Sequence, residues 1–446
     1  MSDDPVRWLA AAATVVAWLV FTGWTVWRFR RKTGPAAQAG STLIAVASQT
    51  GFGDQLAEMT RKAFADAGQP ARVMSFADIE ASDLAAAAQV LFIASTTGEG
   101  DAPDSASGFV RKVMNSQTDL AGVRYGLLSL GDRTYAGFCG FGRTLDAWLR
   151  SAGAQPLFDA VEVDNGDAAA IRHWQGELSR LTGSVAAPDW APPAYADWRL
   201  VERRLLNPGS PGEGAWHLAF EPVDGVLQWV AGDIAEVGVP LAEGELAHRE
   251  YSIASLPADG RAEFLVRRMR RPDGTPGLAS GWLTGTLQVG EIAPMRLRPN
   301  RAFHGPDAAT PMILIGNGTG LAGLRSHLKT RAVSAATGGA WLMFGERTSA
   351  HDCFHDAELQ DWLADGTLTR LDRTFSRDPD DGRYVQAVIA AEAEAVRDWV
   401  ARGAVLYVCG SLEGMAGGVN AALETALGAE ALRDLVETGR YRRDVY

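Results

Sequence analysis

Short apolar runs that end in glycine-containing loops recur along this 446-residue chain, and they constrain its fold more than any other feature. Three of them, at 42–47 (TLIAVA), 90–94 (VLFIA) and 125–130 (YGLLSL), lie in the first half. Continuous apolar runs of this length are typical of strands buried on both faces of a parallel sheet. The carboxyl ends of such strands meet at one edge of a doubly wound sheet, so the loops that follow them can surround one ligand.

These loops are rich in hydroxyl groups and glycine. The first, 48–53 (SQTGFG), leads into a helix expected to begin near Asp54. Free backbone N–H groups and hydroxyls at a helix N-terminus can bind a phosphate dianion without a lysine. The other two read STTGEGD over 95–101 and GDRTY over 131–135. Ordinary glycine turns would explain one such loop, but not three in succession at strand ends.

The three loops resemble those of the flavodoxin domain of diflavin reductases: SQTG for a phosphate, and STxGEGD and LGDxxYxxFCxxG for the two edges of an isoalloxazine ring. The resemblance implies an α/β flavodoxin-like domain over residues 41–183 that binds FMN, with Tyr135 stacked on the ring. Thr97 stands where other members have an aromatic residue, so a smaller side chain is expected on one ring face. The residues assigned to FMN are Ser48, Gln49, Thr50, Gly51, Thr96, Thr97, Gly98, Asp132, Tyr135, Phe138 and Cys139.

A proline-containing linker is expected at 184–197, and the pattern changes after it. Residues 198–305 alternate β-like runs with turns, which predicts an antiparallel β-barrel domain. At strand period two, Arg249 and Tyr251 share one face of a strand and Ser252 points to the other. Such a strand can hold a pyrophosphate on one side and meet a flavin ring edge on the other.

Two motifs in this segment, RxYSxxS at 249–255 and GxxSxxL at 277–283, stand 28 residues apart. Together they resemble the FAD-binding domain of ferredoxin-NADP reductase-like proteins. The resemblance assigns FAD to Arg249, Tyr251, Ser252, Gly277, Ala279 and Ser280.

Residues 306–446 repeat the order of strand, glycine loop and helix, with MILI at 312–315 followed by GNGTG at 316–320. Guanidinium forks and hydroxyls follow later strand ends, and these groups favour a 2′-phosphate and hence NADPH over NADH. Solvated surface arginines are the alternative. The family usually has Ala-Pro after the glycine motif, whereas this chain has Ala322-Gly323. The residues expected to bind NADPH are Gly318, Thr319, Gly320, Arg347, Ser376, Arg377, Tyr384 and Gln386.

The last part of the chain carries LYVCGS at 406–411 and ends in DVY at 444–446. By the same resemblance, Tyr446 covers the flavin face where nicotinamide docks, and moves aside before hydride transfer. Ser252, Cys409 and Asp444 would then surround the reacting atoms. A disordered tail is the alternative.

A stretch of 20 residues without a charge, 8–27, precedes all of this. At about 1.5 Å per residue it would span about 30 Å, the thickness of a bilayer core. The basic cluster at 28–32 follows it, which predicts one transmembrane helix in the inner (cytoplasmic) membrane with the catalytic domains in the cytoplasm. Residues 1–40 would form this anchor and a tether. A cleaved signal peptide is disfavoured because most of the basic charge comes after the apolar run.

Composition excludes some functions. The net charge of −12 disfavours nucleic-acid binding, and three widely spaced cysteines without a CxxC pair indicate no metal site.

The expected activity is electron transfer from NADPH to FAD, then to FMN, then to a one-electron acceptor such as a hemoprotein or a membrane redox partner. The RYRRDVY ending and the FCGFG loop resemble the flavoprotein subunit of sulfite reductase, whereas an anchor resembles an NADPH-hemoprotein reductase. Only 65 residues separate Gly183 from Arg249, too few for the helical connecting domain of the longer members. A sulfite reductase-type or ferric-siderophore reducing system is an alternative, as is a membrane flavin-binding relay that does not oxidise NADPH.

Overall fold

The computed structural model describes residues 41–446, except 49, 134, 184–193, 242–245, 272 and 335. The expected transmembrane segment 8–27 lies outside these residues. Among the described residues, no helix combines the length and the apolar character that crossing a bilayer requires.

The first domain is a parallel sheet with helices on both faces, in the strand order β2-β1-β3-β4, with β5 and β6 both paired to β4. The expected runs at 42–47, 90–94 and 125–130 are its three buried strands, and two apolar cores fill its two faces. Its strands are β1 (Thr42–Ala47), β2 (Ala71–Ser75), β3 (Gln89–Ser95), β4 (Arg124–Gly131), β5 (Gln155–Pro156) and β6 (Val161–Asp164). Its helices are α2 (Phe52–Asp66), α3 (Ala81–Ala86), α4 (Ser107–Phe109), α5 (Gly140–Ser151) and α6 (Ala168–Thr182).

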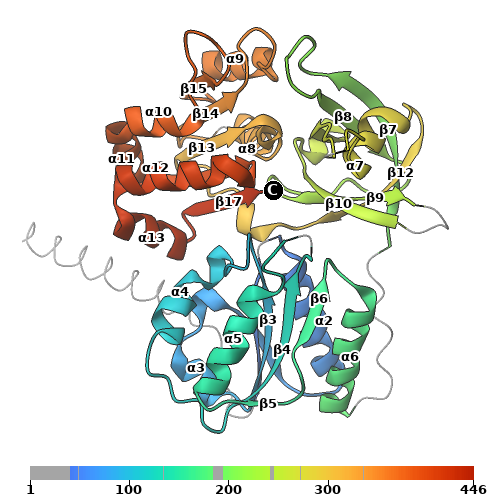
Figure 1. Cartoon of the computed structure of the whole chain (residues 1–446), viewed down its shortest axis with the longest axis vertical. Coiled ribbons are helices and arrows are strands. Elements are labelled where there is room, and N and C mark those ends of the chain that lie inside the picture. The colour runs from blue at the N-terminus through green and yellow to red at the C-terminus, as the bar shows by residue number, and fades with distance from the viewer. Residues whose placement is uncertain are drawn as a thin grey trace, which may run out of the picture.

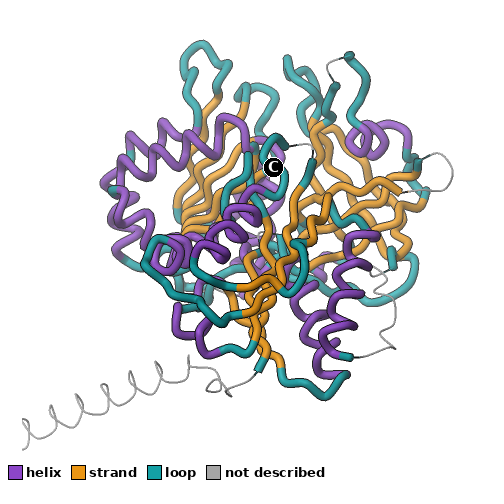
Figure 2. The backbone as a smooth tube through the Cα atoms, turned by 60° about the horizontal axis from the view of Figure 1, so that its bottom comes forward, coloured by secondary structure: helices purple, strands orange, loops and turns teal. Residues whose placement is uncertain are grey.

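The second domain is a six-stranded antiparallel sheet in the order β10-β9-β12-β7-β8-β11, whose two end strands approach each other. Figure 2 shows this part as mostly strand and loop, whereas helices gather around the two parallel sheets. Its strands are β7 (Ala196–Leu205), β8 (Ala215–Pro222), β9 (Ile234–Pro240), β10 (Leu246–Ser252), β11 (Ala262–Arg267) and β12 (Ile292–Arg298). Its short helix α7 (Leu278–Gly281) continues into one π-helical segment, Trp282–Thr286.

The third domain is a second parallel sheet, ordered β15-β14-β13-β16-β17. The end of the chain is its edge strand β17 (Tyr441–Val445), paired to β16, so the alternative of a disordered tail is wrong. The other strands are β13 (Met312–Asn317), β14 (Ala340–Glu346), β15 (Arg370–Phe375) and β16 (Val405–Gly410). The helices are α8 (Leu321–Ser334), α9 (Asp356–Asp365), α10 (Val385–Ala391), α11 (Ala393–Ala401), α12 (Gly417–Leu427) and α13 (Ala429–Glu437).

The second and third domains share one apolar core. Ala254 and Phe303, from the segment with the antiparallel sheet, belong to the same buried cluster as Leu314 and Leu328 of the third domain. The Arg325 guanidinium of α8, itself buried, donates to the Ala254 carbonyl and to Glu263 of β11, and also to Glu358 of α9. These two domains therefore form one packed reductase half.

The first domain docks on this reductase half with the carboxyl ends of its strands facing it (Figure 1). Arg443 of β17 pairs with Asp104, and Glu437 of α13 pairs with Arg111 and Lys112. The first glycine loop also touches the second domain, because a Cβ on Gly51 would lie 2.0 Å from the Pro299 carbonyl oxygen.

Candidate active site

The three loops expected to bind FMN meet at one edge of the first sheet. The second and third loops pack against each other, since the Ala136 N–H donates to Glu99 at 3.1 Å and a Cβ on Gly137 would lie 1.9 Å from the Glu99 carbonyl oxygen. In the first loop, the Gly51 N–H donates to Ser48 Oγ at 3.0 Å, and Gly51 takes the left-handed φ of +80° that favours glycine. Gln49 lies outside the described residues.

The side chains of these loops differ in what they offer a flavin. Tyr135 is exposed at 40%, as a stacking residue must be, and Phe138 is buried beneath the Arg133 guanidinium. The Cys139 thiol is fully buried and contacts the Ser129 carbonyl at 3.4 Å, so it faces the interior of the domain. The Thr97 hydroxyl donates hydrogen bonds to the backbone carbonyls of Asp101 and Ala102.

The loops fit a polar ligand at one further point. Thr96 Oγ1 is buried and meets no hydrogen-bond partner among the residues that the structure describes. A buried hydroxyl without a partner is costly, and a bound ring or ribitol can satisfy it. The residues present therefore fit FMN.

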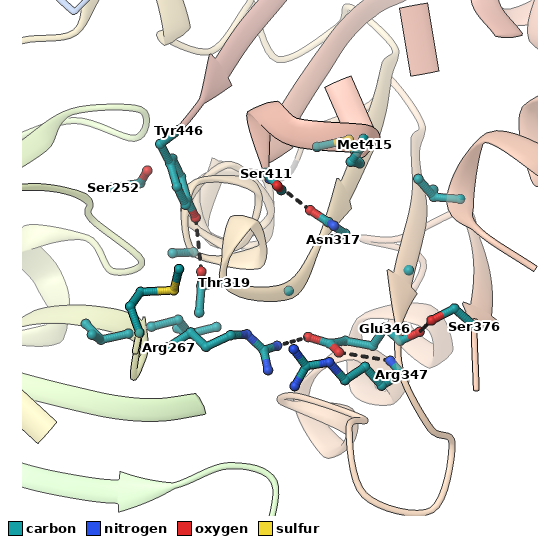
Figure 3. Close-up of a pocket in the computed structure, with 18 of the residues that line it drawn as sticks. Ser252, Arg267, Asn317, Thr319, Glu346, Arg347, Ser376, Ser411, Met415 and Tyr446 are labelled. Carbon is teal, nitrogen blue, oxygen red and sulfur yellow. Dashed lines mark hydrogen bonds and ion pairs between the residues drawn. The ribbon is translucent and has the colours of Figure 1, made fainter. Parts of the chain in front are cut away.

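One cavity of about 910 Å³ lies between the second and third domains and brings the predicted FAD and NADPH residues together (Figure 3). The FAD set reaches it from β10 and α7, and most of the NADPH set reaches it from the loops that follow β13, β14 and β15. The expected residues that line it are Arg249, Tyr251, Ser252, Ser280, Gly318, Thr319, Arg347, Ser376, Arg377, Tyr384, Gln386 and Tyr446. Gly277, Ala279 and Gly320 do not line it: Gly277 caps α7, and Ala279 and Gly320 are buried.

Ser252 lines this cavity, and Asp444 and Cys409, from two other strands, lie directly behind it. Ser252 Oγ donates to Asp444 Oδ2 at 2.6 Å, and Cys409 Sγ lies 3.8 Å from the same oxygen. Burial raises the pKa of the Asp444 carboxyl, and burial beside Asp444 raises the pKa of the Cys409 thiol well above its usual range. The thiol is therefore protonated at neutral pH, and both it and the Ser252 hydroxyl donate toward one carboxylate.

Tyr446 stands between the two sets of residues. Its backbone N–H donates to the Gly410 carbonyl at 3.1 Å, and its hydroxyl lies 3.2 Å from Thr319 Oγ1 of the glycine loop. Figure 3 shows that its ring lies between Ser252 and Thr319.

The outer part of the cavity is rich in guanidinium groups. The Arg377 N–H donates to the Arg347 carbonyl at 2.8 Å, which holds the loops after β14 and β15 together. Arg267, at the end of β11, pairs with the buried Glu346 beside them. Burial and the neighbouring Arg267 lower the pKa of Arg347. Such an excess of positive charge fits the phosphates of a nucleotide.

Sequence reasoning missed Arg267, Glu346 and Arg383, which also line the cavity. Arg267 directly follows the apolar run 264–266 (FLV), so the rule that polar residues at strand ends face a site could have found it.

Two family models match the chain. Flavodoxin matches residues 44–174, and the oxidoreductase NAD-binding domain matches residues 314–421. The flavoprotein alpha-component of NADPH sulfite reductase from Vibrio cholerae is 28% identical, with 92% of this chain and 88% of that protein covered. The same component from Neisseria meningitidis is 27% identical and that from Bacillus subtilis 26%, each with 92% of this chain and 90% of the relative covered.

The two family models and these relatives together support the diflavin reductase family. The alignment of this chain with the Vibrio cholerae protein runs over 542 positions, although it includes only 92% of the 446 residues, which leaves about 130 positions without a residue of this chain. The missing positions agree with the short interval of 65 residues between Gly183 and Arg249, which leaves no room for a helical connecting domain. The chain therefore passes directly from its first domain and linker into the antiparallel sheet.

Proposed function

We propose that this diflavin reductase is a membrane-anchored enzyme that takes electrons from NADPH through FAD and FMN to a one-electron acceptor such as a hemoprotein. The observation that carries the proposal is the single cavity in which the predicted FAD residues, the predicted NADPH residues and Tyr446 meet. The intact cluster of Ser252, Cys409 and Asp444 beside this cavity argues against a relay that does not oxidise NADPH, because such a relay would not need it.

The bound flavins supply the redox chemistry, accepting a hydride at FAD and releasing single electrons from FMN, and the protein sets their position. Arg347, Ser376 and Arg377 hold the nucleotide phosphates. The Ser252 hydroxyl would hydrogen-bond near the flavin ring edge, and the Cys409 thiol would contact the nicotinamide carbon once Tyr446 has moved aside. Asp444 orients both groups, and its carboxylate stabilises the positive charge that develops on the nicotinamide as the hydride leaves.

Docking of the first domain brings its FMN loops toward the reductase half. The Gly51 loop touches Pro299, and Arg298 of β12 lies over the Phe52 ring at 5.6 Å. FMN held by these loops would therefore lie on the side of the first domain that faces the reductase half. Transfer to a protein acceptor then requires the FMN loops to leave this interface, and the 184–197 linker provides the length for that movement.

A second candidate is the flavoprotein of a sulfite reductase-type system, whose acceptor would be a hemoprotein subunit. The names of the relatives and the RYRRDVY ending favour it. The apolar segment 8–27 favours a membrane partner instead, because it would hold the enzyme at the inner membrane with its domains in the cytoplasm.

Anaerobic stopped-flow mixing with NADPH tests the enzyme. We expect bleaching of both flavins, and a protein that retains FAD and FMN but is not bleached would refute NADPH oxidation.

Two further experiments test the acceptor and the anchor. The full chain should remain in the membrane pellet after carbonate washing, whereas a variant lacking residues 1–40 should be released. A full chain that is washed off would refute the anchor. Isolation of the membrane-bound protein should recover a partner with a heme absorption spectrum; reduction of sulfite with a soluble heme subunit would favour the second candidate.

A further inference from the structure

The loop 207–213, which joins β7 and β8 of the FAD domain, packs against the loop of the NADPH domain that carries Arg347. Asp352 fastens the two loops together. Its carboxylate accepts from Asn207 at 3.0 Å and Ser210 at 3.1 Å on one side, and from the Thr348 N–H at 3.0 Å on the other. Asp352 is fully buried, so these charge-assisted hydrogen bonds are shielded from water.

Gly212 of this loop makes room for the Arg347 guanidinium. A Cβ at Gly212 would lie 1.4 Å from Arg347 Nη1 and 2.3 Å from Cζ. Gly212 does not have the positive φ that would itself demand glycine. Any side chain at position 212 must therefore displace the guanidinium, while the backbone can stay as it is.

Few other contacts hold the guanidinium of Arg347 in place. Within the described part of the chain, its buried Nη1 has no hydrogen-bond partner. Burial and the nearby positive charges of Arg267 and Arg377 lower the pKa of Arg347, although Glu346 and Asp352 oppose this shift. The same loop also holds Arg267, whose Nη1 donates to the Glu213 carbonyl at 3.1 Å.

We propose that loop 207–213 of the FAD domain is a positioning element for nucleotide binding: Gly212 seats the Arg347 guanidinium against a phosphate of NADPH, and Asp352 holds the loop in place. This inference rests on the proposed NADPH oxidation. If it is right, a loop of the FAD-binding domain contributes to the affinity of the neighbouring domain for NADPH.

The variant Gly212→Ala tests the proposal in the full chain. Only the far end of a flexible side chain has to move, so FAD content and melting temperature should stay unchanged. Loss of a charge-assisted contact should raise KM for NADPH and Kd for 2′,5′-ADP about tenfold, with kcat at saturating NADPH unchanged. The matched control is Gly285→Ala, in the same domain, whose Cβ would meet only the Arg268 guanidinium at 3.4 Å, away from the cavity.

A double-variant cycle separates positioning from general damage. If Gly212 acts through Arg347, then Gly212→Ala should add nothing to the loss caused by Arg347→Ala. Additive losses, or an unchanged Kd in Gly212→Ala, would overturn the proposal. If Gly212→Ala loses FAD, Ser210→Ala replaces it as a milder variant and should raise Kd about threefold with FAD retained; an unchanged Kd would again overturn it. A wild-type protein that binds no 2′,5′-ADP would refute NADPH use itself, so the two failures are distinguishable.

Discussion

The pairing of Arg443 with Asp104 predicts how firmly the FMN domain is docked. Arg443 Nε donates to Asp104 Oδ2 at 2.8 Å, and a second guanidinium nitrogen binds the other oxygen. The two side chains are 30% and 18% exposed, so the pair is only partly screened by water. Such a forked pair is worth about 1 kcal/mol, at the upper end for a surface ion pair. Replacing Arg443 by Ala should therefore shift the docking equilibrium toward the open form about fivefold.

Small-angle scattering and acceptor kinetics of residues 41–446 measure this shift. In Arg443→Ala the radius of gyration should increase at low salt, and reduction of an added heme protein should accelerate if undocking limits it. Salt should open the wild type toward the same state, because it screens the pair. The matched control exchanges the charges, Asp104→Arg with Arg443→Asp, and should restore the compact form. Identical scattering profiles for wild type and Arg443→Ala at all salt concentrations would refute this reasoning.

Three further predictions concern the reductase half. Asp444→Asn should slow flavin reduction by NADPH about a hundredfold. Because burial raises the pKa of Asp444, the kcat of the wild type should fall at acid pH, with a midpoint above the ordinary 3.8. A steady-state pH profile of Asp444→Asn should lack this fall. Arg377→Ala should raise KM for NADPH about tenfold and leave KM for NADH unchanged, and an equal rise for both nucleotides would contradict its assignment to the 2′-phosphate. Burial lowers the pKa of His217 from 6.5 to about 4, so the unfolded chain binds the extra proton and the free energy of unfolding should decrease as pH falls from about 6.5 to about 4. His217→Leu should make that decrease smaller in melting curves taken against pH, although the buried His327 and His355 also contribute to it; an unchanged slope would contradict the role of His217.

Much of the fold could be predicted because its signals are local. The buried parallel strands show as apolar runs, and each glycine loop follows its strand directly, so β1, β3, β4 and β13 are readable from a few residues each. Ser252, Cys409 and Asp444 lie far apart in the chain, and only the family resemblance grouped them before the structure placed them within hydrogen-bond reach.

The remaining features depend on contacts between distant segments that leave no pattern in sequence. Gly212 looks like any loop glycine until Arg347, from another domain, is seen to occupy the place of its side chain. Arg443 and Asp104 are 339 residues apart, and neither belongs to a motif. The inward direction of the Cys139 thiol is equally hard to predict, because it depends on the packing around the Ser129 carbonyl that it contacts.

The core shared by the antiparallel sheet and the third domain has a thermodynamic consequence. A cut at residue 305 would separate the Arg325 guanidinium from Glu263 and from the Ala254 carbonyl, and would expose apolar surface on both products, so neither piece should fold alone. The FMN domain keeps its own two cores when it undocks. Calorimetry should therefore resolve two cooperative units in residues 41–446, although the strand topology divides the same chain into three domains.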